Sequence, residues 1–370
     1  MTSPTTRSAT MRLGTLAVLL AAACSGNDVA GPRDEQAFDA LLARTEMQAI
    51  DGLLGATAWE SFAAMSPSFG LAPAATAAVA GASELAFARA PQSPLEARLL
   101  ATASAERVWT VAAANEAGVA ALPPATLGTT YTWDTTARRY VATPGRAGAP
   151  ANGVRFVLYA VNPLTREPVV AAEIGYADLT DVGLARPSGV GLRLEVVSGA
   201  TTFLDYTVLA DGSESAGSLS VTGFLTDGTT RLNFDIAARG TSGPTGRTGA
   251  VDFDFDVAEH GFGATGSVRS TSGSNGQVDL VVRVRDARIR FAVIGDEQTV
   301  NASVLVNDRL FATVTGDPRQ PVVRGAGGRE LRPDEAQALG QMLGLADTAF
   351  RVLGELLKPM EAIFALRSLP

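Results

Sequence analysis

The sequence has one cysteine, one histidine and one lysine in 370 residues. A single cysteine excludes a disulfide within the chain and any metal cluster that needs several thiolates. A single histidine excludes sites that need two imidazoles. The single lysine, Lys358, follows Leu357 rather than glycine. That context excludes a phosphate-binding P-loop, whose lysine follows a glycine.

Aromatic residues and positive charge are also scarce. Aromatic residues make up 6% of the chain, with 3 Trp and 5 Tyr. The aromatic girdles of an outer-membrane barrel are therefore not expected. The formal net charge is -8, which argues against nucleic acid as a partner because phosphate binding needs clustered Lys and Arg. With 46% hydrophobic and 18% charged residues, the composition indicates a globular chain that can form a sizeable core.

An apolar run near the amino terminus, Leu13 to Ala22, follows the basic residues Arg7 and Arg12. It has the length of a signal-peptide core and is too short to span a bilayer as a mature helix. The run leads into small residues and then Cys24. This ending resembles the lipobox of bacterial lipoproteins, although alanine stands where the family usually has leucine.

The resemblance implies cleavage before Cys24 and lipidation of that residue, so that acyl chains hold the protein to a membrane. Ser25, rather than aspartate, is typical of lipoproteins sorted to the outer membrane, on its periplasmic side. The alternative is an ordinary secretory signal with an incidental cysteine. Met1 and Met11 are both candidate starts.

The central part of the chain alternates apolar and polar residues. Leu232, Phe234 and Ile236 alternate with polar neighbours, and successive side chains of a strand point to opposite faces. Short turns and no intervening helices favour an antiparallel meander. Strands are predicted at 131–143 (a hairpin), 153–161, 169–177, 191–198, 202–210, 217–226, 229–238, 249–258, 264–270, 278–294, 298–306 and 309–315. Within 278–294 the apolar parity changes near Arg285, which predicts a bulge or a tight turn.

Helical spacing of apolar residues appears on both sides of this region, at 34–64 and 95–114 and again after Pro333. A short helix is also predicted at 76–89, and Pro359 is expected to break the last helical region into two. The sequence thus predicts a β-rich α+β fold, a large antiparallel meander sheet (curved or a half-barrel) covered by N- and C-terminal helices. The predicted regions are a lipoprotein signal peptide at 1–23, a lipidated tether at 24–33, a helical region with an Ala/Pro-rich loop at 34–127, the sheet at 128–316, and a loop with the C-terminal helices at 317–370.

One apolar stripe of the last region is a candidate for facing a hydrophobic ligand. Its members are Phe350, Leu353, Leu357, Met360 and Phe364. Such a stripe most simply packs on the apolar face of the sheet. If helices close a curved sheet only in part, a cavity for an acyl chain remains. Periplasmic lipoprotein carriers have this architecture, and the comparison is one of architecture alone.

Two local motifs suggest chemistry and are better explained by structure. Residues 261–266 match G-x-G-x-x-G, but no helix follows, so we interpret them as a hairpin loop rather than a nucleotide site. Asp252, Asp254 and Asp256 place three carboxylates on one strand face, the weak candidates for a metal site. Pairing of these acids with arginines such as Arg283 and Arg285 is the simpler expectation.

His260 lies in a predicted exposed turn, and no G-x-S-x-G nucleophile elbow occurs in the sequence. We therefore expect no catalytic residues and no cofactor. The predicted function is non-enzymatic, either binding of a lipid or other apolar ligand or scaffolding for an envelope protein at the membrane surface. The alternatives are a periplasmic hydrolase with paired carboxylates and a purely structural or assembly lipoprotein.

Overall fold

The fold comes from a computed structural model, which describes residues 40–54, 61, 122–165, 167–183, 189–213, 215–243, 246–271, 276–295, 298–317 and 320–366. These residues belong to one compact unit, Phe38–Pro370. Cys24 and the helices predicted at 76–89 and 95–114 lie outside the described residues.

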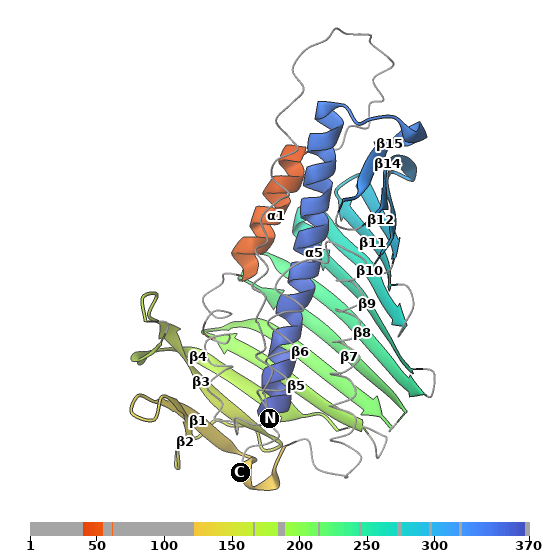
Figure 1. The fold of residues 1–370 in the computed structure, drawn as a ribbon. Coiled ribbons are helices and arrows are strands. Elements are labelled where there is room, and N and C mark those ends of the chain that lie inside the picture. The colour runs from red at the N-terminus through yellow and green to blue at the C-terminus, as the bar shows by residue number, and fades with distance from the viewer. Residues whose placement is uncertain are drawn as a thin grey trace, which may run out of the picture. The chain divides into compact units, whose positions relative to one another are not determined.

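Fifteen strands form one sheet in the described part of the chain (Figure 1). The strands are β1 (Thr129–Asp134), β2 (Arg139–Ala142), β3 (Gly153–Val161), β4 (Pro168–Asp181), β5 (Gly189–Ser198), β6 (Thr201–Gly212), β7 (Ala216–Thr226), β8 (Arg231–Gly243), β9 (Gly246–Val257), β10 (Phe262–Thr271), β11 (Gly276–Val284), β12 (Ala287–Gly295), β13 (Val300–Val306), β14 (Arg309–Gly316) and β15 (Val322–Gly325). From β3 to β15 each strand pairs with the next, antiparallel throughout. The predicted meander is confirmed. The parallel pairing of β1 with β3, which leaves β2 at the edge, was not predicted.

The alternation of apolar and polar residues places the apolar side chains on the buried face, as predicted. Leu232, Phe234 and Ile236 are buried, and so are the apolar residues of β9. The turns also match the sequence: Asn307 and Asp308 both have positive φ, 49° and 63°, as a tight hairpin requires. Only two residues connect β11 to β12, and this tight turn accounts for the change of parity.

Two local predictions differ from the structure, one at the edge strand β15 and one at the start of β10. Strand β15 was not predicted, because Val322–Gly325 is too short to show a pattern. The hairpin loop predicted at 261–266 is wrong, because only Gly261 lies in the turn and β10 begins at Phe262. Gly266 instead lies beneath the ring of Phe253 on β9, where a Cβ atom would collide with that ring. The glycine is therefore required by packing.

Two helices contact each other along the apolar side of the sheet, α1 (Ala40–Leu54) and α5 (Pro333–Leu366) (Figure 1). Short 3-10 turns complete the described elements: η2 (Pro124–Thr126), η3 (Ala258–His260) and η4 (Ala326–Gly328). Buried side chains of both helices and of the sheet form one hydrophobic cluster. Burial of each large apolar side chain stabilises the fold by about 1.5–3 kcal/mol.

The predicted break at Pro359 is wrong, since α5 is one helix of 34 residues. Proline removes only the one backbone donor that would bond the carbonyl of Glu355. Packing just before it is dense: Leu353 and Leu356 are fully buried. The buried hydroxyl of Tyr206 on β6 donates a hydrogen bond to the carbonyl oxygen of Leu356, at 2.5 Å. These contacts hold the helix to the sheet in the turn that precedes the proline.

The start of α5 is fixed by Glu335, two residues after Pro333. Its carboxylate accepts a hydrogen bond from the backbone N–H of Arg332 at 2.9 Å, which is one half of a capping box. It also accepts two hydrogen bonds from Arg329, both at 2.6 Å. The Arg329 hydrogen bonds, with the Arg332 amide and the charges of both arginines, lower the pKa of Glu335 to about 2 against the opposing effect of burial.

Replacing Tyr206 by phenylalanine tests the contact between sheet and helix. The Tyr206→Phe variant keeps the ring and loses the hydroxyl that bonds Leu356, so we expect the free energy of unfolding to fall by about 1–2 kcal/mol. Urea titration measures it. Tyr131→Phe is the control, because no hydrogen bond of the Tyr131 hydroxyl occurs among the described residues, and it should be nearly neutral. Equal values for both variants would contradict the role of Tyr206.

Replacing Glu335 by glutamine tests the cap. A carboxyl whose pKa is lowered on folding adds stability above its unfolded pKa, near 4.5, and that stability disappears as pH falls toward 2. We expect Glu335→Gln to lower stability by about 1 kcal/mol at pH 7, because half-exposed Arg329 is partly screened. The difference from wild type should shrink between pH 4.5 and pH 2. Glu330→Gln, at an exposed carboxylate, is the control, and a pH-independent difference would refute the assignment.

Candidate functional site

The predicted ligand-facing stripe lies on α5, and two of its members have described side chains. Phe350 is buried and packs edge-on against Phe253, with ring centroids 5.8 Å apart. Leu353 is fully buried in the same cluster. Leu357, Met360 and Phe364 also belong to α5, and their side chains lie outside the description. Where it can be followed, the stripe packs into the core.

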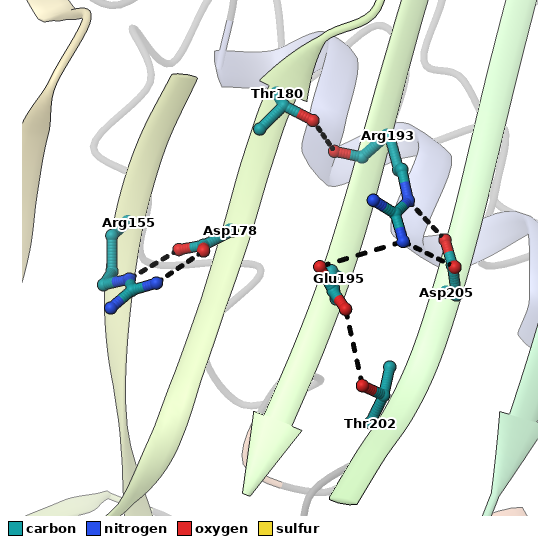
Figure 2. Close-up of polar contacts among 7 residues, drawn as sticks. All are labelled: Arg155, Asp178, Thr180, Arg193, Glu195, Thr202 and Asp205. Carbon is teal, nitrogen blue, oxygen red and sulfur yellow. Dashed lines mark hydrogen bonds and ion pairs between the residues drawn. The ribbon is translucent and has the colours of Figure 1, made fainter. Parts of the chain in front are cut away.

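The opposite face of the sheet is polar and carries ion pairs between neighbouring strands. Arg155 on β3 makes two hydrogen bonds to Asp178 on β4, each 2.7 Å long. Arg193 on β5 does the same with Asp205 on β6, also at 2.7 Å. Figure 2 shows both pairs, with Glu195 at 3.8 Å from Arg193. The bidentate geometry orients each arginine as well as neutralising it.

These pairs keep their arginines charged. Hydrogen bonding to Asp178 raises the pKa of Arg155 in spite of its partial burial, which acts in the opposite direction. Hydrogen bonding to Asp205 raises the pKa of Arg193 for the same reason. Charge and countercharge therefore cancel locally, and this part of the face is polar without a strong field.

An open groove of about 430 Å³ crosses the same face further along the sheet, over β8 to β11. Its lining residues are Asp235, Ala237, Asp252, Phe253, Asp254, Thr265, Gly266, Ser267, Asp279 and Val281. Small residues make the hollow, and four carboxylates give it negative charge. Asp279 bonds Arg290 on β12 at 2.6 and 3.0 Å.

The three aspartates of β9 differ in their partners. Asp252 accepts from Arg239 at 2.8 Å and lies 3.3 Å from Arg269. Asp254 accepts a hydrogen bond from the hydroxyl of Thr265 at 3.2 Å and lies directly opposite Asp235 on β8. The expectation that these acids pair with arginines is confirmed for Asp252 alone.

The partner arginines are not the ones predicted. Arg285 pairs instead with Glu46 of α1, and no ion pair of Arg283 occurs among the described residues. Asp256, like Asp254, has no arginine partner in the described part of the chain. Within those same residues, no three His, Cys, Asp or Glu side chains lie close enough together to hold a metal ion. Alternation along one strand spaces the carboxylates rather than converging them.

A second polar cluster surrounds His260, which is not in the exposed position predicted. The imidazole is 30% exposed, and its Nδ1 atom lies 2.9 Å from the carboxylate oxygen Oε2 of Glu46, a residue only 1% exposed. Nε2 lies 3.3 Å from the hydroxyl of Thr230. Arg285 donates to the other Glu46 oxygen at 3.4 Å. This cluster was not predicted from the sequence.

One signal for the cluster was present in the sequence. Glu46 stands four residues after Leu42 and four before Ile50, which places an acid on the apolar stripe of its helix. A buried carboxylate needs a partner. The partners, Thr230 and His260, are remote in sequence and come together only through the topology of the sheet.

Membrane attachment through Cys24 is untested by the structure, because that residue lies outside the described part. No described helix is long and apolar enough to cross a membrane. Comparison of the chain with protein-family models, with characterised proteins and with solved structures found no match. The candidate sites therefore depend on their own geometry.

Two charge-removing variants separate the paired from the unpaired acids of β9. Asp254→Asn removes one of two like charges that face each other across strands, so we expect it to raise the free energy of unfolding by about 0.2–1 kcal/mol. Asp252→Asn leaves Arg239 and Arg269 without their shared carboxylate, so we expect a loss of about 0.5–1 kcal/mol. Thermal and urea unfolding in low salt measure both. Effects of the same sign would contradict the pairing described above.

Proposed function

We propose that this chain is an envelope lipoprotein, held to the outer membrane by acyl chains on Cys24, that acts as a scaffold for another envelope component. The signal-like segment ending at Cys24 supports the anchor. Two or more acyl chains give stable attachment, because each buried methylene contributes about 0.8 kcal/mol. With a net charge of -8, a nucleic acid is not part of the proposal.

The observation that carries the scaffold role is the contrast between the two faces of the sheet. One face joins α1 and α5 in a single hydrophobic cluster. No described helix covers the other face, which presents arginine–carboxylate pairs and the acidic groove. Polar surfaces of this kind support specific contacts to a partner, because charged pairs fix orientation and register.

The apolar-ligand role is the weaker of the two binding roles. Phe350 and Leu353, proposed from the sequence as ligand-facing, already pack among the side chains of the sheet. A ligand there would have to displace part of this core. The proposed architecture is a sheet that curves around α5 like a half-barrel. Side chains of the core fill the space between sheet and helix along the described part of α5.

Site-specific photo-cross-linking in cells tests the scaffold role. A benzophenone amino acid at Ala237, in the groove, should give a defined adduct with an envelope component. The same residue at Leu343, half exposed on α5, is the control and should give none. Cys24→Ala should move the protein from the membrane fraction to the soluble fraction, because it removes the site of lipidation, and should abolish the adduct.

The two parts of the proposal can fail separately. A Cys24→Ala protein that stays with the membrane would refute lipid anchoring at that residue. Adducts at Leu343 and none at Ala237 would refute the outer face of the sheet as the contact surface.

A further inference from the structure

The carboxylate of Glu46, the imidazole of His260 and the hydroxyl of Thr230 lie side by side in space, with the imidazole between the other two. The three side chains come from α1, from the turn η3 and from the turn between β7 and β8. The distances are 2.9 Å from Oε2 of Glu46 to Nδ1 of His260 and 3.3 Å from Nε2 to Oγ1 of Thr230. Hydrolases with a hydroxyl nucleophile use the same arrangement, in which an acid orients a base and the base contacts the hydroxyl.

The buried carboxylate beside Nδ1 favours the tautomer in which Nδ1 carries the proton. At neutral pH a carboxylate only accepts hydrogen bonds, so its close approach to Nδ1 is favourable when Nδ1 bears the hydrogen. Nε2 then has a free lone pair and faces the Thr230 hydroxyl as an acceptor. This is the polarity that a general base needs.

One carboxylate oxygen of Glu46 is available to hold the imidazole. Its Oε2 atom is buried and, at the present angle of the ring, lacks a well-aligned hydrogen bond among the described residues. The other oxygen is bonded by Arg285, which keeps the carboxylate in place.

The backbone around the site is held by its own hydrogen bonds. Asp227 accepts from the backbone N–H groups of Thr229 and Thr230, each at 2.8 Å, which fixes the turn that presents Thr230. Gly261, at φ 61°, ends the turn that carries His260. Its carbonyl accepts from the backbone N–H of Arg285 at 2.7 Å. The hydroxyl and the base are thus set on two braced turns, both partly open to solvent.

We propose that Thr230, His260 and Glu46 form a nucleophilic site that hydrolyses small activated carboxylic esters. Thr230 Oγ attacks the acyl carbon as its proton passes to Nε2 of His260, and the leaving alcohol takes that proton as its bond to the acyl carbon breaks. Water then attacks the acyl-threonine ester, gives a proton to Nε2, and Thr230 recovers it as the carboxylic acid leaves. Glu46 acts as a positioning residue for the imidazole.

The same geometry limits the substrate. The amide of Thr230 is engaged by Asp227, so it is not free to stabilise an oxyanion. A site this open suits small esters with a good leaving group rather than long acyl chains. This activity goes beyond the scaffold role and does not depend on it.

A fluorophosphonate probe and p-nitrophenyl acetate test the site on the purified protein that begins at residue 25. We expect the probe to modify Thr230, located by peptide mass spectrometry, and ester hydrolysis to fall at least tenfold in Thr230→Val and in His260→Gln. Thr230→Ser should retain activity. Thr136→Val, at an exposed threonine in the turn between β1 and β2, is the matched control and should behave as wild type.

The single histidine allows a direct test of the positioning by Glu46. ¹⁵N NMR of the imidazole should show the proton on Nδ1, and Glu46→Gln should shift the tautomer balance toward Nε2. A thermal melt of each variant separates loss of fold from loss of chemistry. Thr230→Val with a wild-type melt and undiminished hydrolysis, or a probe that labels another residue, would overturn the proposal and leave the cluster as a clamp on α1.

Discussion

The burial of one face of a wide open sheet is the constraint on which the rest of this structure depends. Alternation gives the central strands of the described sheet an apolar face, and such a face must pack against something other than water. Helix α5 meets this need, with Leu353 and Leu356 fully buried and Tyr206 bonded to the helix carbonyl at 2.5 Å. These contacts fix α5 in the turn before Pro359, and the helix continues past that residue.

The same alternation determines the chemistry of the other face. In most central strands the residues of the second face are left at least partly to water, and like charges on neighbouring strands repel. Arg155 with Asp178 and Arg193 with Asp205 remove that repulsion where they occur. The arrangement is different at Asp235 and Asp254, which face each other without an arginine. These two carboxylates therefore give the groove its negative charge.

Most of the sheet could be predicted because its signal is local. Alternation and turn residues located strands β1 to β14, and Val322–Gly325 was missed because four residues show no period.

 The segment predicted at 278–294 forms two strands, because its tight turn divides it into β11 and β12. Tertiary contacts decided the rest: the parallel neighbour of β1, the continuity of α5, and the glycine beneath Phe253. None of these has a local signature, since each depends on which elements the fold places together.

The His260 cluster shows the same limit and adds a reason to expect chemistry there. An acid on the apolar stripe of a helix opposes the local pattern, and native sequences break such rules mainly where a function compensates. Glu46 lies 1% exposed against a ring that is 30% exposed, so the imidazole connects a buried charge to a solvent-facing hydroxyl. A helix clamp alone would need only Arg285, which already bonds the carboxylate. What the arginine does not explain is the hydroxyl on the far side of the ring, at 3.3 Å from Nε2.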